Sequence, residues 1–210
     1  MEQSIGVFGH DVLLWACLLR QTAQRPQAQT LHQHANYLLD ELKRSAEAQA
    51  LPVRSVEAGE FAIAALIDEI AMGFPDLRPF WSQYQLQAAR FNTNNAGVEV
   101  FERLHDVRRG PPSVIATYAV VLGLGFQGCY GLPGADRYAL QQLRRDLGTQ
   151  LGVDPDRDWK GGVLRRIRVE EVENLDLFDV PWFKSIWMGR AIGIVLVLTA
   201  AFAFLWRYVL

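Results

Sequence analysis

Apolar residues recur every three or four positions along most of the first 151 residues of the chain. This spacing is the period of an α-helix that buries one face and exposes the other. In the segment TLHQHANYLLDELKRSAEA (30–48), the apolar positions lie on one helical face: Leu31, Ala35, Leu38, Leu39, Leu42 and Ala46. We therefore predict an all-α fold, a bundle of about seven helices.

Proline, glycine and small polar residues divide this pattern into separate helices. The first apolar run, Val12–Leu19, is predicted to be a core helix, and the segment LPVRS (51–55) breaks the helical pattern of residues 30–48. Ser55 is expected to cap the next helix, which should end near Gly73 because Pro75 follows. The remaining predicted helices cover residues 79–91, 97–109, 114–126 and 137–151.

The C-terminal segment is apolar on every side rather than amphipathic. From Ser185 to Trp206 the chain has 22 residues and a single charge, Arg190. A transmembrane helix needs about 20 predominantly apolar residues, and an arginine near one end can reach the membrane interface. Trp187 and Trp206 lie near the two ends, as in the aromatic belts of membrane proteins. We predict a single transmembrane tail anchor over residues 185–208; the alternative is a buried C-terminal core helix.

The charges around this segment indicate its orientation. Lys184 and Arg190 lie before or at its start and Arg207 at its end, which agrees with a cytoplasmic N-terminal domain and a periplasmic C-terminus. The predicted organisation is a cytoplasmic helical bundle domain over residues 1–151, a membrane-proximal linker over 152–184 and the tail anchor over 185–208. The linker contains the basic run RRIR and five acids within EEVENLDLFD. A strand or short helix packed on the domain is an equal alternative for this region.

Charge and composition argue against several classes of function. The 210 residues carry 21 basic and 23 acidic side chains, a formal net charge of −2, so no basic surface for nucleic acid is expected. Cys17 and Cys129 have neither disulfide-framework nor metal-ligand spacing, and we expect both to be small buried side chains. The four histidines are not spaced as zinc ligands either, and we expect them at the surface: His10, His32, His34 and His105.

The segment GLGFQG (123–128) matches the dinucleotide-binding pattern G-x-G-x-x-G. That pattern binds pyrophosphate only when a strand precedes it and a helix opens at its end. Here the next residues are CYGLPGADR, which cannot open a helix, and no alternation of strands and helices surrounds them. We therefore predict the end of a helix followed by a tight loop, and no nucleotide or other cofactor.

Two adjacent acids, Asp68 and Glu69, follow a nearly continuous apolar run in the segment ALIDEIAM (65–72). Neighbouring residues on a helix point about 100° apart, so the two carboxylates cannot act together on one atom. Two interpretations remain open. The acids pair internally with a basic residue of another helix, such as Arg20 or Arg90, or they line a protein-docking cleft. Catalysis is a third and weaker interpretation, because no nucleophile or metal-ligand set accompanies the acids.

Several short motifs occur in a set order along the chain. A leucine-rich helical pair is followed by ALIDE (65–69), a tryptophan, RFN (90–92), a Gly-x-x-x-Phe helix, LGLGFQGCYG (122–131), a short helix and the apolar tail. This order resembles the TssL/DotU family, the small inner-membrane subunit of type VI and type IV B secretion systems, over most of residues 10–150 and the tail. The matching positions are Asp68, Glu69, Trp81, Phe91, Asn92, Gly97, Phe101, Gly125, Phe126, Gly128 and Tyr130.

The chain departs from the family pattern at a few positions. Family members commonly carry a glutamate and a basic residue where this chain has Gln127 and Cys129, so the charge pair of that loop is missing. A glutamate that often follows the glycine of the Gly-x-x-x-Phe helix is here Val98, and Glu99 comes one place later. The chain is also expected to be a short form, without a peptidoglycan-binding extension beyond the membrane.

The resemblance implies a hook-like cytoplasmic bundle, anchored in the bacterial inner membrane by one span and without enzymatic activity. It implies two kinds of partner, a large membrane subunit of the TssM/IcmF type and a baseplate protein such as TssK. It also implies that Asp68 and Glu69 line a protein-interaction cleft. Gly189 and Gly193 add a GxxxG spacing that lets two membrane-spanning helices pack closely, so self-association is a further expectation. The alternatives are a tail-anchored adaptor of another envelope complex, including a type IV B system, and a membrane-tethered enzyme.

Overall fold

The fold is arranged around one long helix, α4 (Val53–Gly73), in a computed structural model that describes residues 6–22 and 24–152. All described residues belong to the first of two compact units of the chain. The other helices, in chain order, are α1 (His10–Gln21), α2 (Ala28–Arg44), α3 (Ala46–Gln49), α5 (Arg78–Trp81), α6 (Leu86–Phe91), α7 (Ala96–Val107), α8 (Pro112–Gly123), the 3-10 helix η1 (Gly128–Gly131) and α9 (Arg137–Gln150). The prediction of an all-α fold is confirmed for the described residues.

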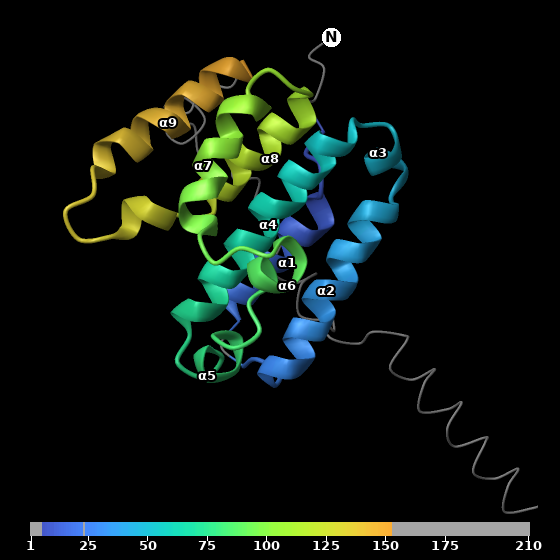
Figure 1. The fold of residues 1–210 in the computed structure, drawn as a ribbon, viewed down its shortest axis with the longest axis vertical. Helices are drawn as coiled ribbons and strands as arrows, with labels where there is room; N and C mark the ends of the chain where they lie inside the picture. Colours follow the sequence, from blue (N-terminus) through green and yellow to red (C-terminus); the bar gives the residue numbers. More distant parts are fainter. Residues whose placement is uncertain (1–5, 23, 153–210) are drawn as a thin grey trace, which may run out of the picture. The chain divides into compact units, whose positions relative to one another are not determined.

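Helix α4 is buried because its neighbours surround it. It packs against α1, α2, α5, α6, α7 and α8, and Figure 1 shows it in the middle of the domain. A helix enclosed on every side needs apolar residues all round rather than on one stripe. This requirement explains why residues 61–67 form a continuous apolar run instead of an amphipathic pattern, and all seven of these side chains are buried.

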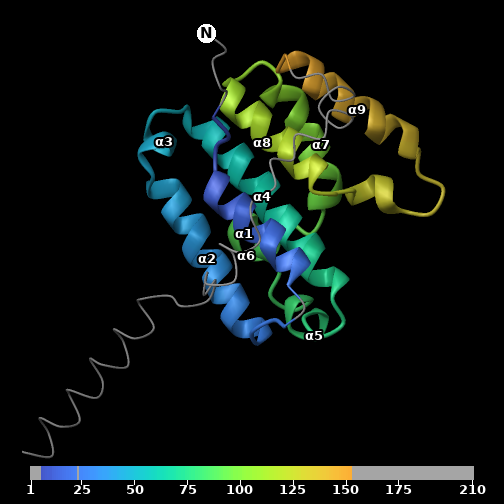
Figure 2. The same cartoon turned by 180° about the vertical axis from the view of Figure 1, so that it is seen from behind.

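The two flanks of the domain differ. Helix α2 lies on one side of α4 and continues into the short α3, whereas α7, α8 and α9 lie on the other side, as both views show (Figures 1 and 2). Helix α9 packs against α8 and η1. Its first turn is capped by Asp136, whose carboxylate accepts hydrogen bonds from the backbone N–H groups of Tyr138 and Ala139 at 2.9 and 3.1 Å.

Helix α8 is the most apolar of the long helices, and it is a core helix. Among the residues that the structure describes, the segment 112–131 is apolar and long enough to cross a membrane by composition alone. However, α8 packs against α4 and α9, and the hydroxyl of its fully buried Tyr118 donates to the Ala58 carbonyl at 3.1 Å. The predicted linker (152–184) and tail anchor (185–208, with Gly189 and Gly193) lie outside the described residues, apart from Gly152.

The predicted helix boundaries are only partly confirmed: α8 ends at Gly123 rather than at residue 126, and the segment 30–48 is divided between α2 and α3. Helix α4 ends at Gly73 as predicted, but it begins at Val53 after Pro52, so Ser55 lies inside the helix and does not cap it. The helix predicted over residues 79–91 is two short helices, α5 and α6, with a turn between them. Directly after the turn, Asp68 of α4 accepts hydrogen bonds from the backbone N–H groups of Leu86 and Gln87, which stabilise the separate start of α6.

Candidate functional site

Asp68 is almost fully buried on α4, and its carboxylate holds three hydrogen-bond donors. Oδ1 accepts from Trp81 Nε1 at 2.7 Å and from the backbone N–H of Leu86 at 2.9 Å, and Oδ2 accepts from the backbone N–H of Gln87 at 2.9 Å. Leu86 and Gln87 are the first two residues of α6, whose own N-cap residue Gln85 makes no side-chain cap. Asp68 therefore caps α6 from a different helix and joins α4, α5 and α6.

The protonation of Asp68 reflects two opposing effects. Burial raises its pKa to about 6, while the hydrogen bonds from the amides of Gln87 and Leu86 and from the Trp81 indole lower it. Near neutral pH the carboxylate is mainly ionised, and all three donors point at it. Its chemistry is therefore that of a structural acceptor.

Glu69 points to a different side of α4, as the helical angle between adjacent residues requires. Its two carboxylate oxygens accept from the backbone N–H groups of Gln127 and Gly128, each at 2.9 Å. These two amides belong to the GLGFQG segment, where α8 ends at Gly123 and a tight loop follows, as predicted. The N–H groups that would bind a phosphate in a dinucleotide fold here bind an internal carboxylate.

Neither acid pairs with an arginine in the part of the chain that the structure describes. Arg20 donates from Nη1 to the carbonyl of Leu124, and Arg90 binds Glu60 and Asp40. The interpretation that Asp68 and Glu69 pair internally with Arg20 or Arg90 is therefore wrong, because backbone N–H groups take the place of the arginines.

Glu60 is a buried acid that the sequence reasoning missed. Its side chain is fully buried on α4, and Oε1 accepts from Arg90 Nε at 2.9 Å and Nη2 at 2.7 Å. Lys43 Nζ lies 3.1 Å from Oε2, as an ion pair without the alignment of a hydrogen bond. Arg90 also binds Asn36 and Asp40 on α2, at 3.1 and 2.8 Å. The available signal was a single acid directly before the apolar run 61–67.

The glycines of the family pattern allow two backbones to touch. A Cβ atom at Gly97, on α7, would lie 3.3 Å from the Gly128 Cα, and Gly128 itself has a positive φ of 50°. The aromatic residues of the pattern pack around this contact. The ring of Phe101 meets Tyr130 edge to face with centroids 4.8 Å apart, and Phe126 lies 5.9 Å away. These residues join α7 to the loop that Glu69 holds.

The other matching positions are also structural. Asn92 ends α6 in the left-handed conformation, with φ of 53°, which asparagine tolerates better than most residues. Phe91 packs edge to face on Phe61 of α4, with ring centroids 5.0 Å apart. Gly125 also has a positive φ, 100°, in the loop after α8. Together with the indole of Trp81, these residues fix the elements that surround the C-terminal half of α4.

Two cavities flank Glu69 at the domain surface. The larger one, which we call the Arg20 cavity, has a volume of about 410 Å³ and is lined by Arg20, Leu66, Glu69, Ile70, Gly73, Phe74, Gly125 and Gln127. The smaller one, the Asp68 cavity, has a volume of about 110 Å³ and is lined by Ala65, Asp68, Glu69, Met72, Gln85, Gln87, Ala96, Gly97 and Phe126. Glu69 is the wall between them, so the conformation that its two hydrogen bonds impose on the loop shapes both cavities.

The histidines divide into two groups. His10 and His105 are exposed, as predicted, but the prediction is wrong for His32 and His34, which are half-buried. His32 packs edge to face on Trp81, with ring centroids 5.2 Å apart, and burial lowers the pKa of both half-buried rings. Cys17 and Cys129 are half-buried free thiols rather than fully buried. Within residues 6–22 and 24–152, no three His, Cys, Asp or Glu side chains are grouped to hold a metal ion.

Comparison with known proteins gives a family and two similar folds. The family model described as "Type VI secretion system protein DotU" matches residues 8–208. The cytoplasmic domain of TssL from Acinetobacter baumannii is 24% identical in sequence, with a TM-score of 0.62, and the match covers 68% of this chain and 93% of that one. SciP/TssL from enteroaggregative Escherichia coli 042 is 25% identical, with a TM-score of 0.57 and coverage of 68% and 84%. No curated protein matches the chain in sequence. Because the family model spans nearly the whole chain, the protein belongs to the DotU family of type VI secretion system proteins.

Proposed function

We propose that this chain is a non-enzymatic scaffold subunit of the type VI secretion membrane complex, whose helical domain docks baseplate components to the inner-membrane core. The family match supports a subunit of a type VI rather than a type IV B system. The observation that carries the docking role is the pair of cavities on either side of Glu69. They open where three separate parts of the chain, α4, α6 and the loop after α8, are held together, so a partner can contact all three at once.

The two conspicuous acids support a scaffold role rather than a catalytic one. A general acid or base must be able to exchange a proton with a substrate. The oxygens of Asp68 and Glu69 accept hydrogen bonds from five donors of the domain itself. Their contribution to docking is therefore to shape the cavities, and the exposed surface around Glu69 is the predicted contact.

The remaining parts of the proposal rest on the sequence pattern. Residues 185–208 form a single inner-membrane span, with the helical domain in the cytoplasm and the C-terminus in the periplasm, and residues 152–184 connect the two. The span associates with a large subunit of the TssM/IcmF type, and the Gly189–Gly193 spacing supports packing of two copies. The cytoplasmic domain binds a baseplate protein such as TssK.

Affinity capture from gently solubilised membranes tests the assignment as a whole. Mass spectrometry should recover a large multi-span membrane subunit together with baseplate proteins. Recovery of the chain alone from membranes that contain intact secretion complexes would contradict the proposal. A C-terminal alkaline phosphatase fusion should be active and an N-terminal one inactive, because the enzyme folds only in the periplasm; the reverse result would contradict the orientation.

A bulky residue at the mouth of the Arg20 cavity tests the docking site itself. Gly73 lies at the end of α4, and an added Cβ there has no neighbour within 4 Å, so Gly73→Trp should fill the mouth without disturbing the fold. We expect strongly reduced capture of baseplate proteins with unchanged membrane insertion. Gly6→Trp is the matched control, since Gly6 is also free of neighbours and does not line this cavity. Equal capture by the two variants would show that docking occurs elsewhere.

A further inference from the structure

The Arg20 cavity combines apolar walls with one cation. Leu66 and Ile70 of α4 and Phe74 provide the apolar part, and Arg20 projects from α1. A volume of about 410 Å³ lies within the usual range of roughly 300–1,000 Å³ for ligand sites. The cavity is therefore large enough for a bulky side chain and part of the segment that carries it.

The two charged residues that line the cavity, Arg20 and Glu69, do not form the ion pair that we considered from the sequence. The negative charge of Glu69 is directed at two N–H groups of the loop after α8. Arg20, in contrast, makes one hydrogen bond, to the Leu124 carbonyl, and no ion pair to any described residue. A guanidinium carries five N–H donors, so most of the hydrogen-bonding capacity of Arg20 remains available at the cavity.

The Arg20 guanidinium lies against the loop after α8, where it donates to the Leu124 carbonyl. A Cβ atom at Gly125 would collide with the Arg20 guanidinium, and Gly125 has a φ of 100° that favours glycine. The absence of a side chain at this position makes room for the arginine beside the loop that Glu69 holds. The cation thus lines the exposed side of the cavity, where a partner can reach it.

We propose that the Arg20 cavity binds a partner protein segment that carries a carboxylate next to a large apolar side chain. This inference rests on the proposed docking function and names the chemistry of the docked partner. The carboxylate accepts charge-assisted hydrogen bonds from Arg20, and the apolar side chain lies against Leu66, Ile70 and Phe74. The cavity therefore favours a negatively charged partner, whereas two adjacent acids in a sequence would suggest a positively charged one. In the described structure the acids already accept hydrogen bonds from the domain itself, and most N–H donors of Arg20 are available.

Three matched peptides test this chemistry on the full chain reconstituted in nanodiscs. The probes are acetyl-Gly-Glu-Phe-Gly-amide and its glutamine and lysine counterparts, each with a 4-fluorophenylalanine whose 19F NMR line width reports binding. We expect the glutamate peptide to bind about fivefold more tightly than the glutamine peptide, and the lysine peptide most weakly. Arg20→Gln should remove the preference and Arg20→Lys should keep it. Preference for the lysine peptide, no binding of any peptide, or an unchanged preference in Arg20→Gln would overturn the proposal.

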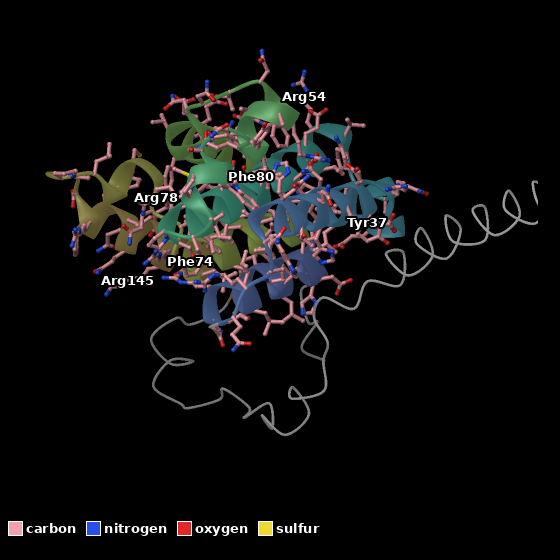
Figure 3. The ribbon with its side chains drawn as sticks, turned by 90° about the horizontal axis from the view of Figure 1, so that it is seen from below. Tyr37, Arg54, Phe74, Arg78, Phe80 and Arg145 are labelled. Carbon is pink, nitrogen blue, oxygen red and sulfur yellow. The ribbon has the colours of Figure 1, made fainter. Side chains whose placement is uncertain are left out.

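A control substitution separates local from general charge effects. Arg54 lies on the first turn of α4, at the other end of the helix from Glu69, and Figure 3 shows it on a different side of the domain from Phe74 and Arg78. Arg54→Gln removes the same charge and should leave the peptide ranking unchanged; loss of the ranking in this variant would contradict the local role of Arg20.

The Gly73→Trp capture experiment separates this proposal from the docking function. If Gly73→Trp lowers baseplate capture but the peptides do not rank by charge, docking stands and the proposed partner chemistry is wrong. If the peptides rank as expected but capture by Gly73→Trp is normal, the cavity binds acidic segments and the proposed docking function at this site is wrong.

Discussion

The buried network around Glu60 allows a quantitative prediction, because Glu60 and Arg90 each retain different interaction partners when the other is removed. Arg90→Met leaves a fully buried carboxylate whose remaining partner is Lys43, itself half-exposed. Glu60→Met leaves an arginine that still binds Asp40 at 2.8 Å and Asn36 at 3.1 Å. Removing the arginine should therefore cost more free energy of unfolding than removing the acid.

The magnitudes follow from the burial of the pair. Breaking a buried ion pair by removing one partner costs about 3–5 kcal/mol. The Lys43 ammonium, 3.1 Å from the carboxylate, places Arg90→Met near the lower end, at about 3 kcal/mol. Glu60→Met should cost about 1–2 kcal/mol, because Arg90 retains two partners near solvent. The double variant, with two methionines of similar volume in contact, should cost about 1 kcal/mol or less.

Urea unfolding of the full chain in detergent micelles, followed by far-ultraviolet circular dichroism, measures these changes. The double-mutant cycle should give a coupling free energy of about 3–4 kcal/mol between Glu60 and Arg90. Arg44→Met is the matched control, since Arg44 pairs with Glu41 at the exposed surface of α2 and should contribute less than about 1 kcal/mol. Equal costs for the two single variants, or a coupling below about 0.5 kcal/mol, would refute the reasoning.

Two further predictions follow from the site. The folded pKa of Asp68, about 6, exceeds its ordinary value of 3.8, so folding binds a proton between these values and the unfolding free energy falls as pH rises from about 4 to 6. Asp68→Asn should remove about 2–3 kcal/mol of this pH dependence in urea titrations, whereas parallel curves for both proteins would contradict it. Gly128→Ala forces an alanine to a φ of 50° and against the Gly97 carbonyl, and should destabilise the domain by about 2 kcal/mol or more. Gly134→Ala is the control, because Gly134 also has a positive φ, 82°, but no neighbour within 4 Å; it should lower the stability in thermal unfolding by only about 1 kcal/mol. Equal losses of stability in the two variants would show that the contact with Gly97 is unimportant.

The fold class could be predicted because helical periodicity is a local property. The spacing of apolar residues in 30–48 requires only that neighbouring turns of one helix share a face, and α2 has the predicted buried residues Leu31, Ala35, Leu39 and Leu42. The end of α4 at Gly73 was equally local, since Pro75 stops the helix two residues later. The family pattern was recognisable for the same reason, as a set of short motifs in order.

Boundaries that depend on distant groups could not be predicted in this way. The turn between α5 and α6 is stabilised by Asp68, which lies 18 residues before Leu86. Nothing in the local pattern of residues 79–91 indicates that a carboxylate from another helix satisfies the first amides of α6. A single continuous helix was therefore the expected result, and the tertiary contact decided against it.

For the candidate site, the sequence by itself determined which residues are unusual and tertiary structure decided what they do. Two acids beside a buried run, at helical positions about 100° apart, must reach different surroundings, and they do. The groups that they reach are backbone amides, which every residue carries and no sequence pattern marks. The same holds for Arg20, which is one arginine among many in the sequence. Its open position in a cavity exists only because α1, α4 and the loop after α8 meet there, and contacts between segments more than a hundred residues apart are set by packing rather than by local periodicity.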